Sequence, residues 1–74
     1  MKLYTKTICP KCLWVKAELK QKNIDVTEIN IEHDDEACAF LQSEGVLAVP
    51  ALQVGDTLYT TTADIFAQIG VMTA

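Results

Sequence analysis

The residues best suited to chemistry in this sequence are two cysteines, Cys9 and Cys12, separated only by Pro10 and Lys11. A Cys-x-x-Cys pair is typical of a dithiol that exchanges electrons with disulfides, and it also forms half of many zinc sites. Proline suits the first position of a helix because its fixed φ is helical and its missing N–H would be unpaired there. Pro10 therefore predicts that a helix begins immediately after Cys9.

At the start of that helix, Cys9 would occupy the N-cap position. Its sulfur would meet unpaired backbone N–H groups and the positive end of the helix dipole, both of which stabilise a thiolate. Cys12 would lie one turn further along, close enough to attack a disulfide that Cys9 forms with a substrate. We therefore predict that Cys9 is the nucleophile and that Cys12 is the resolving thiol.

All six lysines lie in the first 22 residues, where Glu18 is the only acid, and the other nine acids follow without any Lys or Arg. Such a pattern often means only two solvated faces of opposite sign. Alternatively, the basic segment surrounds the cysteine pair, where Lys6 and Lys11 would lower the pKa of the Cys9 thiol from its reference of about 8.5 and attract anionic groups. The isoelectric point of about 4.6 argues against nucleic-acid binding.

The predicted elements indicate an α/β fold in a single domain, residues 1–74, because a chain of this length leaves no room for a second core. A strand, an amphipathic helix and an alternating strand at the start indicate a right-handed βαβ unit with parallel strands. Acids then begin a second helix, Gly55-Asp56 supplies a hairpin turn, and Thr61 or Thr62 caps a third helix. The expected strands are 2–5, 24–31, 51–54 and 57–59, and the expected helices are 10–22, 34–44 and 61 or 62 to about 70, in the order β-α-β-α-β-β-α.

The first predicted helix carries two neighbouring apolar stripes, one with Leu13 and Ala17 and the other with Val15 and Leu19. We expect both stripes to face the core, while the lysines of this helix reach outward on their long stems. Trp14 directly follows the cysteine pair, and we interpret it as a partly packed surface residue.

No apolar run approaches the roughly 18 residues that span a bilayer, and residues 1–5 lack the apolar stretch of a signal peptide. Three cysteines are an odd number, and two of them are only three positions apart, which does not fit a structural disulfide framework of the secreted kind. We therefore expect a cytoplasmic protein that acts as a monomer without membrane contact, and whose cysteine pair is catalytic or metal-binding.

Four short segments carry a resemblance to a known family in their order and spacing: 4–12 around the cysteines, 28–31, 34–37, and 45–50 before the hairpin. Through them nearly the whole chain resembles the glutaredoxin family of the thioredoxin-like superfamily, close to the small glutaredoxin-like redoxins that donate electrons to ribonucleotide reductase. The resemblance implies a thioredoxin-like fold, with a four-stranded mixed sheet flanked by three helices. It also implies a dithiol-disulfide oxidoreductase that reduces protein disulfides through the Cys-Pro-Lys-Cys site.

In proteins of this family, the proline that corresponds to Pro50 is cis and lies beside the nucleophile, and the residue before it offers backbone groups to the substrate. The resemblance therefore implies these roles for Pro50 and Val49, with Pro10 and Lys11 contacting the substrate from within the motif. Proline has no N–H to obstruct the cysteines, and a cis turn presents backbone groups to an extended peptide.

Lys6 matches the glutaredoxin lysine that pairs with a glutathione carboxylate, and Asp64 matches the acid that meets the glutathione amino group. Glutaredoxins also carry two glycines after the last strand, where this chain has Thr60 and Thr61, and the reductase-donor redoxins carry Trp-Ser-Gly-Phe where it reads Leu58–Thr61. A substrate would meet Thr61 and Asp64 here, and the threonine side chains fill space that glycine leaves open. We therefore expect thioredoxin reductase to reduce the site faster than glutathione, with ribonucleotide reductase among the candidate substrates and no bound cofactor.

Three alternatives use the same cysteines. The chain could be a glutathione-dependent glutaredoxin, or a module that holds an iron-sulfur cluster between two subunits with glutathione as co-ligand. A zinc site would need His33 and Cys38 to complete a Cys₃His set, although the topology holds the second helix away from the start of the first. Cys38, between two alanines, is more simply a small buried residue of an apolar helix. Brown, dimeric protein would indicate the cluster, and colourless protein with two titratable thiols would indicate the dithiol enzyme.

Overall fold

The computed structural model describes residues 1–46 and 48–73 of the chain. These residues form strands and helices in the predicted order β-α-β-α-β-β-α. The elements are β1 (Lys2–Thr5), α1 (Pro10–Gln21), β2 (Thr27–Asn30), α2 (Asp35–Ser43), β3 (Ala51–Val54), β4 (Thr57–Tyr59) and α3 (Thr62–Thr73).

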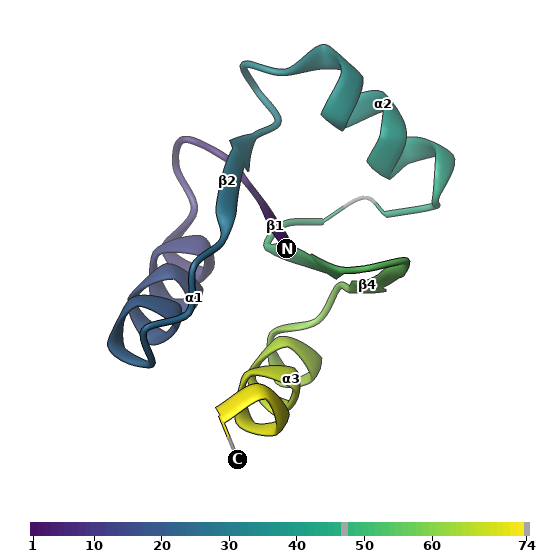
Figure 1. Cartoon of the computed structure of the whole chain (residues 1–74). Coiled ribbons are helices and arrows are strands. Elements are labelled where there is room, and N and C mark those ends of the chain that lie inside the picture. Colours follow the sequence, from purple (N-terminus) through teal and green to yellow (C-terminus); the bar gives the residue numbers. More distant parts are fainter. Residues whose placement is uncertain (47, 74) are drawn as a thin grey trace.

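The strands form one mixed sheet in the order β2-β1-β3-β4 (Figure 1). β1 runs parallel to β2 and antiparallel to β3, and β3 pairs antiparallel with β4. Leu3 lies opposite Glu28 on one side and Leu52 on the other, so β1 is a central strand and β2 an edge strand. The predicted α/β class, the parallel βαβ unit and the mixed sheet are therefore confirmed.

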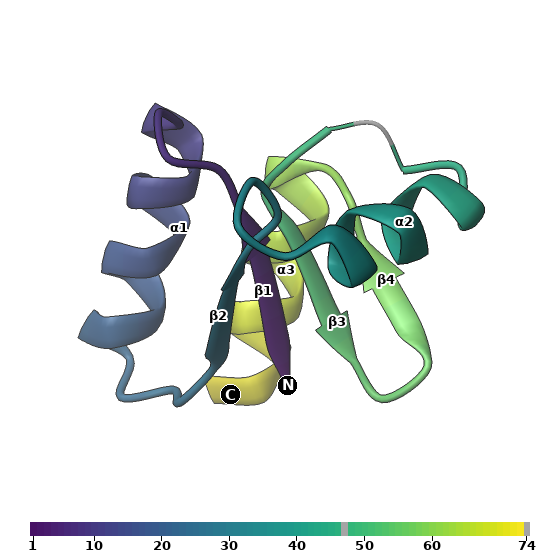
Figure 2. The same ribbon diagram turned by 90° about the horizontal axis from the view of Figure 1, so that it is seen from above.

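The two faces of the sheet carry different helices: α1 and α3 cover one face, and α2 covers the other (Figure 2). Successive residues of a strand point to opposite faces, so Leu3 packs with the core under α1 and α3 whereas Tyr4 packs with the core under α2. A short loop, residues 6–9, joins the carboxyl end of β1 to the amino end of α1. The first strand thus leads directly to the cysteine pair.

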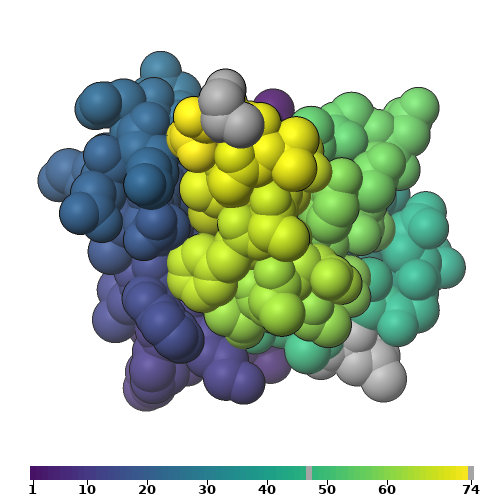
Figure 3. Space-filling view, turned by 90° about the horizontal axis from the view of Figure 1, so that it is seen from below, coloured from purple at the N-terminus to yellow at the C-terminus, as the bar shows by residue number. Residues whose placement is uncertain are grey.

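Helices α1 and α3 lie side by side on one face of the molecule (Figure 3). Trp14 of α1 is 61% exposed and packs edge-on against Phe66 of α3, with 5.2 Å between the ring centroids. The interpretation of Trp14 as a partly packed surface residue is therefore confirmed.

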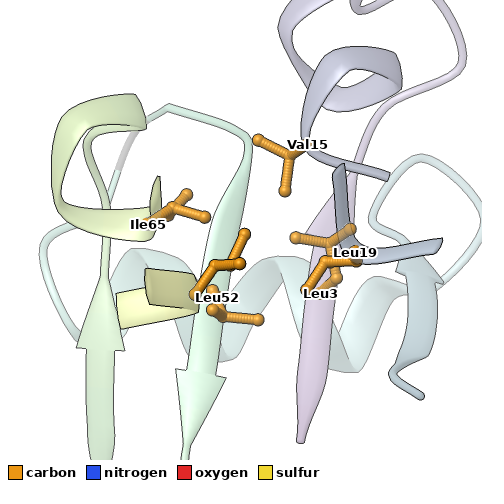
Figure 4. Packing of buried hydrophobic residues seen from close by; sticks show 6 residues of the cluster. Leu3, Val15, Leu19, Leu52 and Ile65 are labelled. Carbon is orange, nitrogen blue, oxygen red and sulfur yellow. The ribbon is translucent and has the colours of Figure 1, made fainter. Parts of the chain in front are cut away.

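The larger hydrophobic core lies between the sheet and this pair of helices (Figure 4). Strands β1 and β3 and helices α1 and α3 each contribute at least one aliphatic side chain that is almost completely removed from water, and this burial is the main favourable term in folding. The buried members of this core are Leu3, Val15, Leu19, Leu52, Ile65 and Ile69.

Helix α1 packs on the sheet through a narrower face than predicted. Its buried residues are Cys12, Val15 and Leu19, which recur at the spacing of one helical face. The prediction that Leu13 and Ala17 also face the core is wrong, because Leu13 is 63% exposed and Ala17 is exposed as well. Each residue lies about 100° further round a helix than the one before it, so a helix that buries Cys12 turns Leu13 outward.

Strand β2 is shorter than the predicted strand 24–31. Asn23 has a positive φ of 57°, and the N–H of Ile24 donates to a carbonyl of the last turns of α1 at 2.9 Å. The chain is therefore still turning away from the helix at these residues. Pairing begins at Thr27, opposite Lys2, because β1 offers a partner only from there onward.

Helix α3 continues to Thr73, beyond its predicted end near Gly70. A single glycine weakens a helix without breaking it, and the Thr73 hydroxyl donates a hydrogen bond to the Ile69 carbonyl at 2.9 Å. Among the described residues, no helix is long and apolar enough to cross a membrane.

Candidate active site

The loop between β1 and α1 places Cys9 at the amino end of α1, as predicted. Cys9 is the N-cap, with an extended backbone (φ −153°, ψ 94°), and Pro10 is the first helical residue. The N–H of Leu13 donates to the Cys9 carbonyl at 3.1 Å, which begins the helical ladder. Cys9 and Cys12 are joined by a disulfide, with 5.2 Å between their Cα atoms.

The two sulfurs of the pair differ in their access to solvent. Cys12 is only 1% exposed, whereas Cys9 is half-buried at the surface. The backbone N–H of Cys12 donates to Cys9 Sγ at 3.1 Å, and the first turn of α1 contains no acid that would offset the positive end of the dipole. In the reduced protein, both features favour negative charge on Cys9.

An open groove of about 440 Å³ lies along Cys9. The β1–α1 loop forms one side of it, and the segment before β3 forms the other. The Val49–Pro50 peptide bond is cis and Pro50 is buried, as the resemblance to glutaredoxins implies. The fold thus brings Val49 to the nucleophile, although the two are distant in the sequence. The residues that line the groove are Lys6, Ile8, Cys9, Pro10, Lys11, Ala48 and Val49.

Sequence reasoning did not identify two residues of this groove, Ile8 and Ala48. Ile8 is 89% exposed. An exposed isoleucine is unremarkable alone, but its position immediately before Cys9 was a usable signal, since apolar surface beside a nucleophile marks a contact site. Ala48 gave no signal, because its approach to Cys9 depends on how the segment before β3 packs.

The positive charge of the groove comes from Lys6 and Lys11. Within residues 1–46 and 48–73, the one ion pair joins Lys16 and Glu28 at 3.0 Å, so neither groove lysine is paired with a described acid. Two of the six lysines therefore lie beside the cysteine pair, which agrees with the second interpretation of the charge pattern for Lys6 and Lys11.

Thr61 and Asp64, both within the described residues, are not part of this lining. They lie at the start of α3, where the Thr61 hydroxyl accepts a hydrogen bond from the backbone N–H of Asp64 at 3.1 Å. The Thr61 carbonyl accepts another from the N–H of Ile65 at 3.0 Å. The geometry gives Thr61 a capping role, and a contact of Thr61 or Asp64 with a substrate stays a prediction.

Cys38 lies on α2 as a half-buried free thiol, and the Gln42 side chain donates a hydrogen bond to its sulfur at 3.8 Å. His33 is exposed in the loop before that helix. In the part of the chain that the structure describes, no three His, Cys, Asp or Glu side chains gather into a group that could hold a metal ion. The Cys₃His set considered from the sequence is therefore not assembled.

Comparisons with known proteins agree with this architecture. A family model for glutaredoxin matches residues 1–59, and no curated protein matches the chain significantly. NrdH-redoxin from Escherichia coli, a glutaredoxin-like protein with a thioredoxin-like activity profile, superposes with a TM-score of 0.79 at 24% identity, covering 89% of this chain and 90% of that one. A mutant of a thioredoxin-like protein gives 0.79 at 22% identity over 90% and 93% of the two chains, and a buckwheat glutaredoxin–glutathione complex gives 0.76 at 20% identity over 97% and 69%.

The structural likenesses establish the fold as thioredoxin-like, with the four-stranded mixed sheet and three helices implied by the resemblance. The family model begins at the first residue and ends with β4, so it contains the cysteine pair and the Val49–Pro50 turn. The chain belongs to the glutaredoxin family and is a thiol-disulfide oxidoreductase.

Proposed function

We propose that this protein reduces disulfides of other proteins through Cys9 and Cys12, with Cys9 as the nucleophile. The observation that carries the proposal is the asymmetry of the pair, since Cys9 reaches the surface and accepts the N–H of Cys12, whereas Cys12 is 1% exposed. A nucleophile must reach the disulfide of a bulky substrate, but a resolving thiol needs only to reach Cys9.

The proposed reaction begins with both cysteines reduced. The Cys9 thiolate attacks one sulfur of the substrate disulfide, which forms a mixed disulfide and releases the other substrate sulfur as a thiolate that takes up a proton. Cys12 then gives up its proton and attacks Cys9 Sγ, which closes the Cys9–Cys12 disulfide and releases the second substrate thiol. The substrate gains two electrons and two protons; the enzyme loses two electrons and the Cys12 proton, and the second proton comes from the surrounding water, which received the Cys9 proton when its thiolate formed.

The groove beside Cys9 is proposed to hold the substrate segment that flanks the disulfide. Lys6 and Lys11 attract acidic side chains of that segment, and backbone groups of Val49 pair with it when it is extended. Pro10 lines the groove and the buried Pro50 directly follows Val49, and neither proline has an N–H group that would need a partner.

We expect a flavoprotein such as thioredoxin reductase to return electrons to the Cys9–Cys12 disulfide. Support comes from Thr60 and Thr61, which stand where glutaredoxins have the glycines that admit glutathione. Ribonucleotide reductase is a candidate substrate because the resemblance extends to the redoxins that serve it. We further propose a monomer that works in the cytoplasm without a bound cofactor.

The experiment is insulin reduction coupled to NADPH oxidation, run once with thioredoxin reductase and once with glutathione plus glutathione reductase. We expect faster turnover with thioredoxin reductase than with glutathione and glutathione reductase. In parallel, Cys12→Ser should accumulate a mixed disulfide between Cys9 and an insulin chain, detected by mass spectrometry after non-reducing separation. In Cys9→Ser, an adduct on Cys12 or Cys38 at a yield equal to that on Cys9 in Cys12→Ser would refute the assigned roles.

A second candidate, glutathione-dependent reduction, is favoured by one observation: Lys6, the expected partner of a glutathione carboxylate, lies in the groove at Cys9. The buckwheat glutaredoxin was solved with glutathione bound. The same coupled assay decides between the two electron sources. The colour and oligomeric state of the purified protein test the cluster-binding alternative, since a brown dimer would support it and a colourless protein would not.

A further inference from the structure

The loop that carries Cys9 is fastened to the end of β2 by hydrogen bonds outside the strand ladder. Thr7, two residues before Cys9, donates its backbone N–H to Glu32 Oε1 at 2.6 Å. The hydroxyl of Thr7 accepts a hydrogen bond from Asn30 Nδ2 at 3.1 Å, and Asn30 Oδ1 accepts the backbone N–H of Glu32 at 2.9 Å. Thr7, Asn30 and Glu32 form a closed set, which we call the loop latch.

The carboxylate of Glu32 is charged in this arrangement. The backbone N–H of Thr7 is the largest cause that lowers the pKa of Glu32, and its hydroxyl and the charges of Lys6 and His33 act in the same direction. A hydrogen bond from an N–H to a charged carboxylate is stronger than one to a neutral acceptor. The latch therefore holds Thr7 by its backbone N–H as well as by its hydroxyl.

The latch acts on a short segment whose two ends are already fixed. Thr5 is 1% exposed, and its carbonyl accepts the N–H of Ile31 at 2.9 Å. At the other end, Cys9 caps α1. Of the residues between them, Lys6 and Ile8 line the groove, and Thr7 has hydrogen bonds to the last residue of β2 and to the loop that follows it. The latch thus adds a third fixed point, at Thr7, in the middle of the segment that joins β1 to Cys9.

We propose that Glu32 and Asn30 are positioning residues for the nucleophile, acting through Thr7 to hold Cys9 and its side of the groove in the geometry that attack on a protein disulfide needs. The inference rests on the proposed role of Cys9 and goes beyond it, because neither residue touches the cysteine pair or belongs to the motif. A misplaced nucleophile loses rate even when its chemistry is intact.

The experiment compares Glu32→Ala, which removes the acceptor, with Glu32→Gln, which removes only the charge and keeps an amide oxygen that can accept from Thr7. Glu36→Ala is the matched control, since it removes an equally exposed carboxylate from the first turn of α2. The rate constant for the reaction of each reduced protein with insulin is measured by stopped flow. Amide hydrogen exchange at Thr7 is followed by NMR, and thermal unfolding midpoints are recorded under reducing conditions.

We expect Glu32→Ala to react about tenfold more slowly with insulin than the wild type, Glu32→Gln to keep at least about half the rate, and Glu36→Ala to be unchanged. The Thr7 amide should exchange slowly in the wild type, although the residue is exposed, and rapidly in Glu32→Ala. Equal rates for Glu32→Ala and Glu36→Ala, equal losses for Ala and Gln, or rapid Thr7 exchange in the wild type would each overturn the proposal. Failure of the wild type to reduce insulin would instead reject the proposed function, while Thr7 exchange would still report whether the latch forms.

Discussion

Helices α1 and α2 begin with the same geometry and different chemistry. Cys9 and Asp34 are both N-caps with extended backbones, at φ −153°, ψ 94° and φ −140°, ψ 96°. Each side chain accepts a hydrogen bond from the N–H three residues on, Cys9 Sγ from Cys12 at 3.1 Å and Asp34 Oδ1 from Ala37 at 3.0 Å. The same backbone device therefore serves both helices.

The difference lies in how well each helix end is neutralised. Asp34 is among the best capping residues, and Asp35 and Glu36 add negative charge to the first turn of α2. α1 is capped by sulfur, a weak acceptor, and its first turn has no acid. The positive end of α2 is neutralised within the protein, whereas that of α1 is left to stabilise a thiolate. Weak conventional capping is thus itself a sign of the reactive helix.

The sharpest test of this comparison is Cys9→Ser. Serine is a better N-cap than cysteine, so we expect α1 to remain at least as stable under reducing conditions. Disulfide reductase activity should nevertheless fall by at least about a thousandfold, since the hydroxyl of serine is a poor nucleophile at this position. Insulin turnover and thermal unfolding in dithiothreitol measure the two effects. Activity that survives in the variant would show that Cys12 or Cys38 can act alone.

The cap of α3 supplies the second test. By the resemblance, Thr60 and Thr61 correspond to two glycines of glutaredoxins, and Thr61 also caps α3 through its hydroxyl. Replacing both with glycine should raise glutathione-dependent turnover about fivefold because it removes side-chain bulk from the expected glutathione path. The cost in stability should be small, since glycine is itself an acceptable N-cap.

The control for this pair is the double serine variant, which keeps a Cβ and a hydroxyl at both positions. Its glutathione-dependent turnover should match that of the wild type in the same coupled NADPH assay. If the wild type already turns over robustly with glutathione, and the glycine variant does not change that rate, the threonines do not exclude glutathione.

Local chemistry predicted the helix starts well. Pro10 and the helix-capping role of Cys9 follow from rules that act within one turn. The hairpin at Gly55, whose φ is 59°, is a further case. Each of these features depends on a few adjacent residues, so the amino-acid sequence alone was enough to predict it.

The features that sequence reasoning missed depend on contacts between distant segments. Leu13 and Val15 are similarly apolar, and only the burial of Cys12 decides which of them faces the sheet. Ala48 reaches the groove because of how its segment packs beside Cys9. Glu32 was one acid among ten until the fold placed it against the backbone of Thr7.

A smaller effect is expected when the conventional cap is removed. Asp34→Ala leaves the N–H of Ala37 without its side-chain partner and takes a charge from the start of α2, which should lower the free energy of unfolding by about 1 kcal/mol. Insulin reduction should be unchanged, because Asp34 bonds to Ala37 of its own helix and is not a member of the loop latch. Urea unfolding and the coupled assay measure the two quantities. A loss of activity greater than the loss of folded protein would mean that the two helix ends are not independent.

The smallest expected effect concerns the ion pair that ties α1 to the edge strand. Glu28 Oε2 accepts hydrogen bonds from Lys16 Nζ and from the buried hydroxyl of Thr5, both at 3.0 Å. The pKa of Glu28 is lowered from its ordinary value of 4.5, chiefly by the hydrogen bond from Lys16, while partial burial opposes this. Because the folded pKa lies below the unfolded one, the contribution of this group to stability is fully present above pH 4.5 and is lost as the pH falls through the folded pKa.

Glu28→Gln isolates this contribution, since the amide oxygen can still accept from Thr5 while the charge that Lys16 meets is gone. Both side chains of the pair are more than one third exposed, so the wild type should exceed the variant by no more than about 1 kcal/mol near neutral pH. The difference should decrease when the pH is lowered from neutral to a value well below 4.5, because the carboxylate of Glu28 then becomes protonated in the wild type as well. Urea unfolding of the two proteins at both pH values measures it, with Glu44→Gln as a control for loss of one exposed charge. A difference that persists unchanged at the lower pH would show that Glu28 stabilises the α1–β2 contact by packing, and not through its charge.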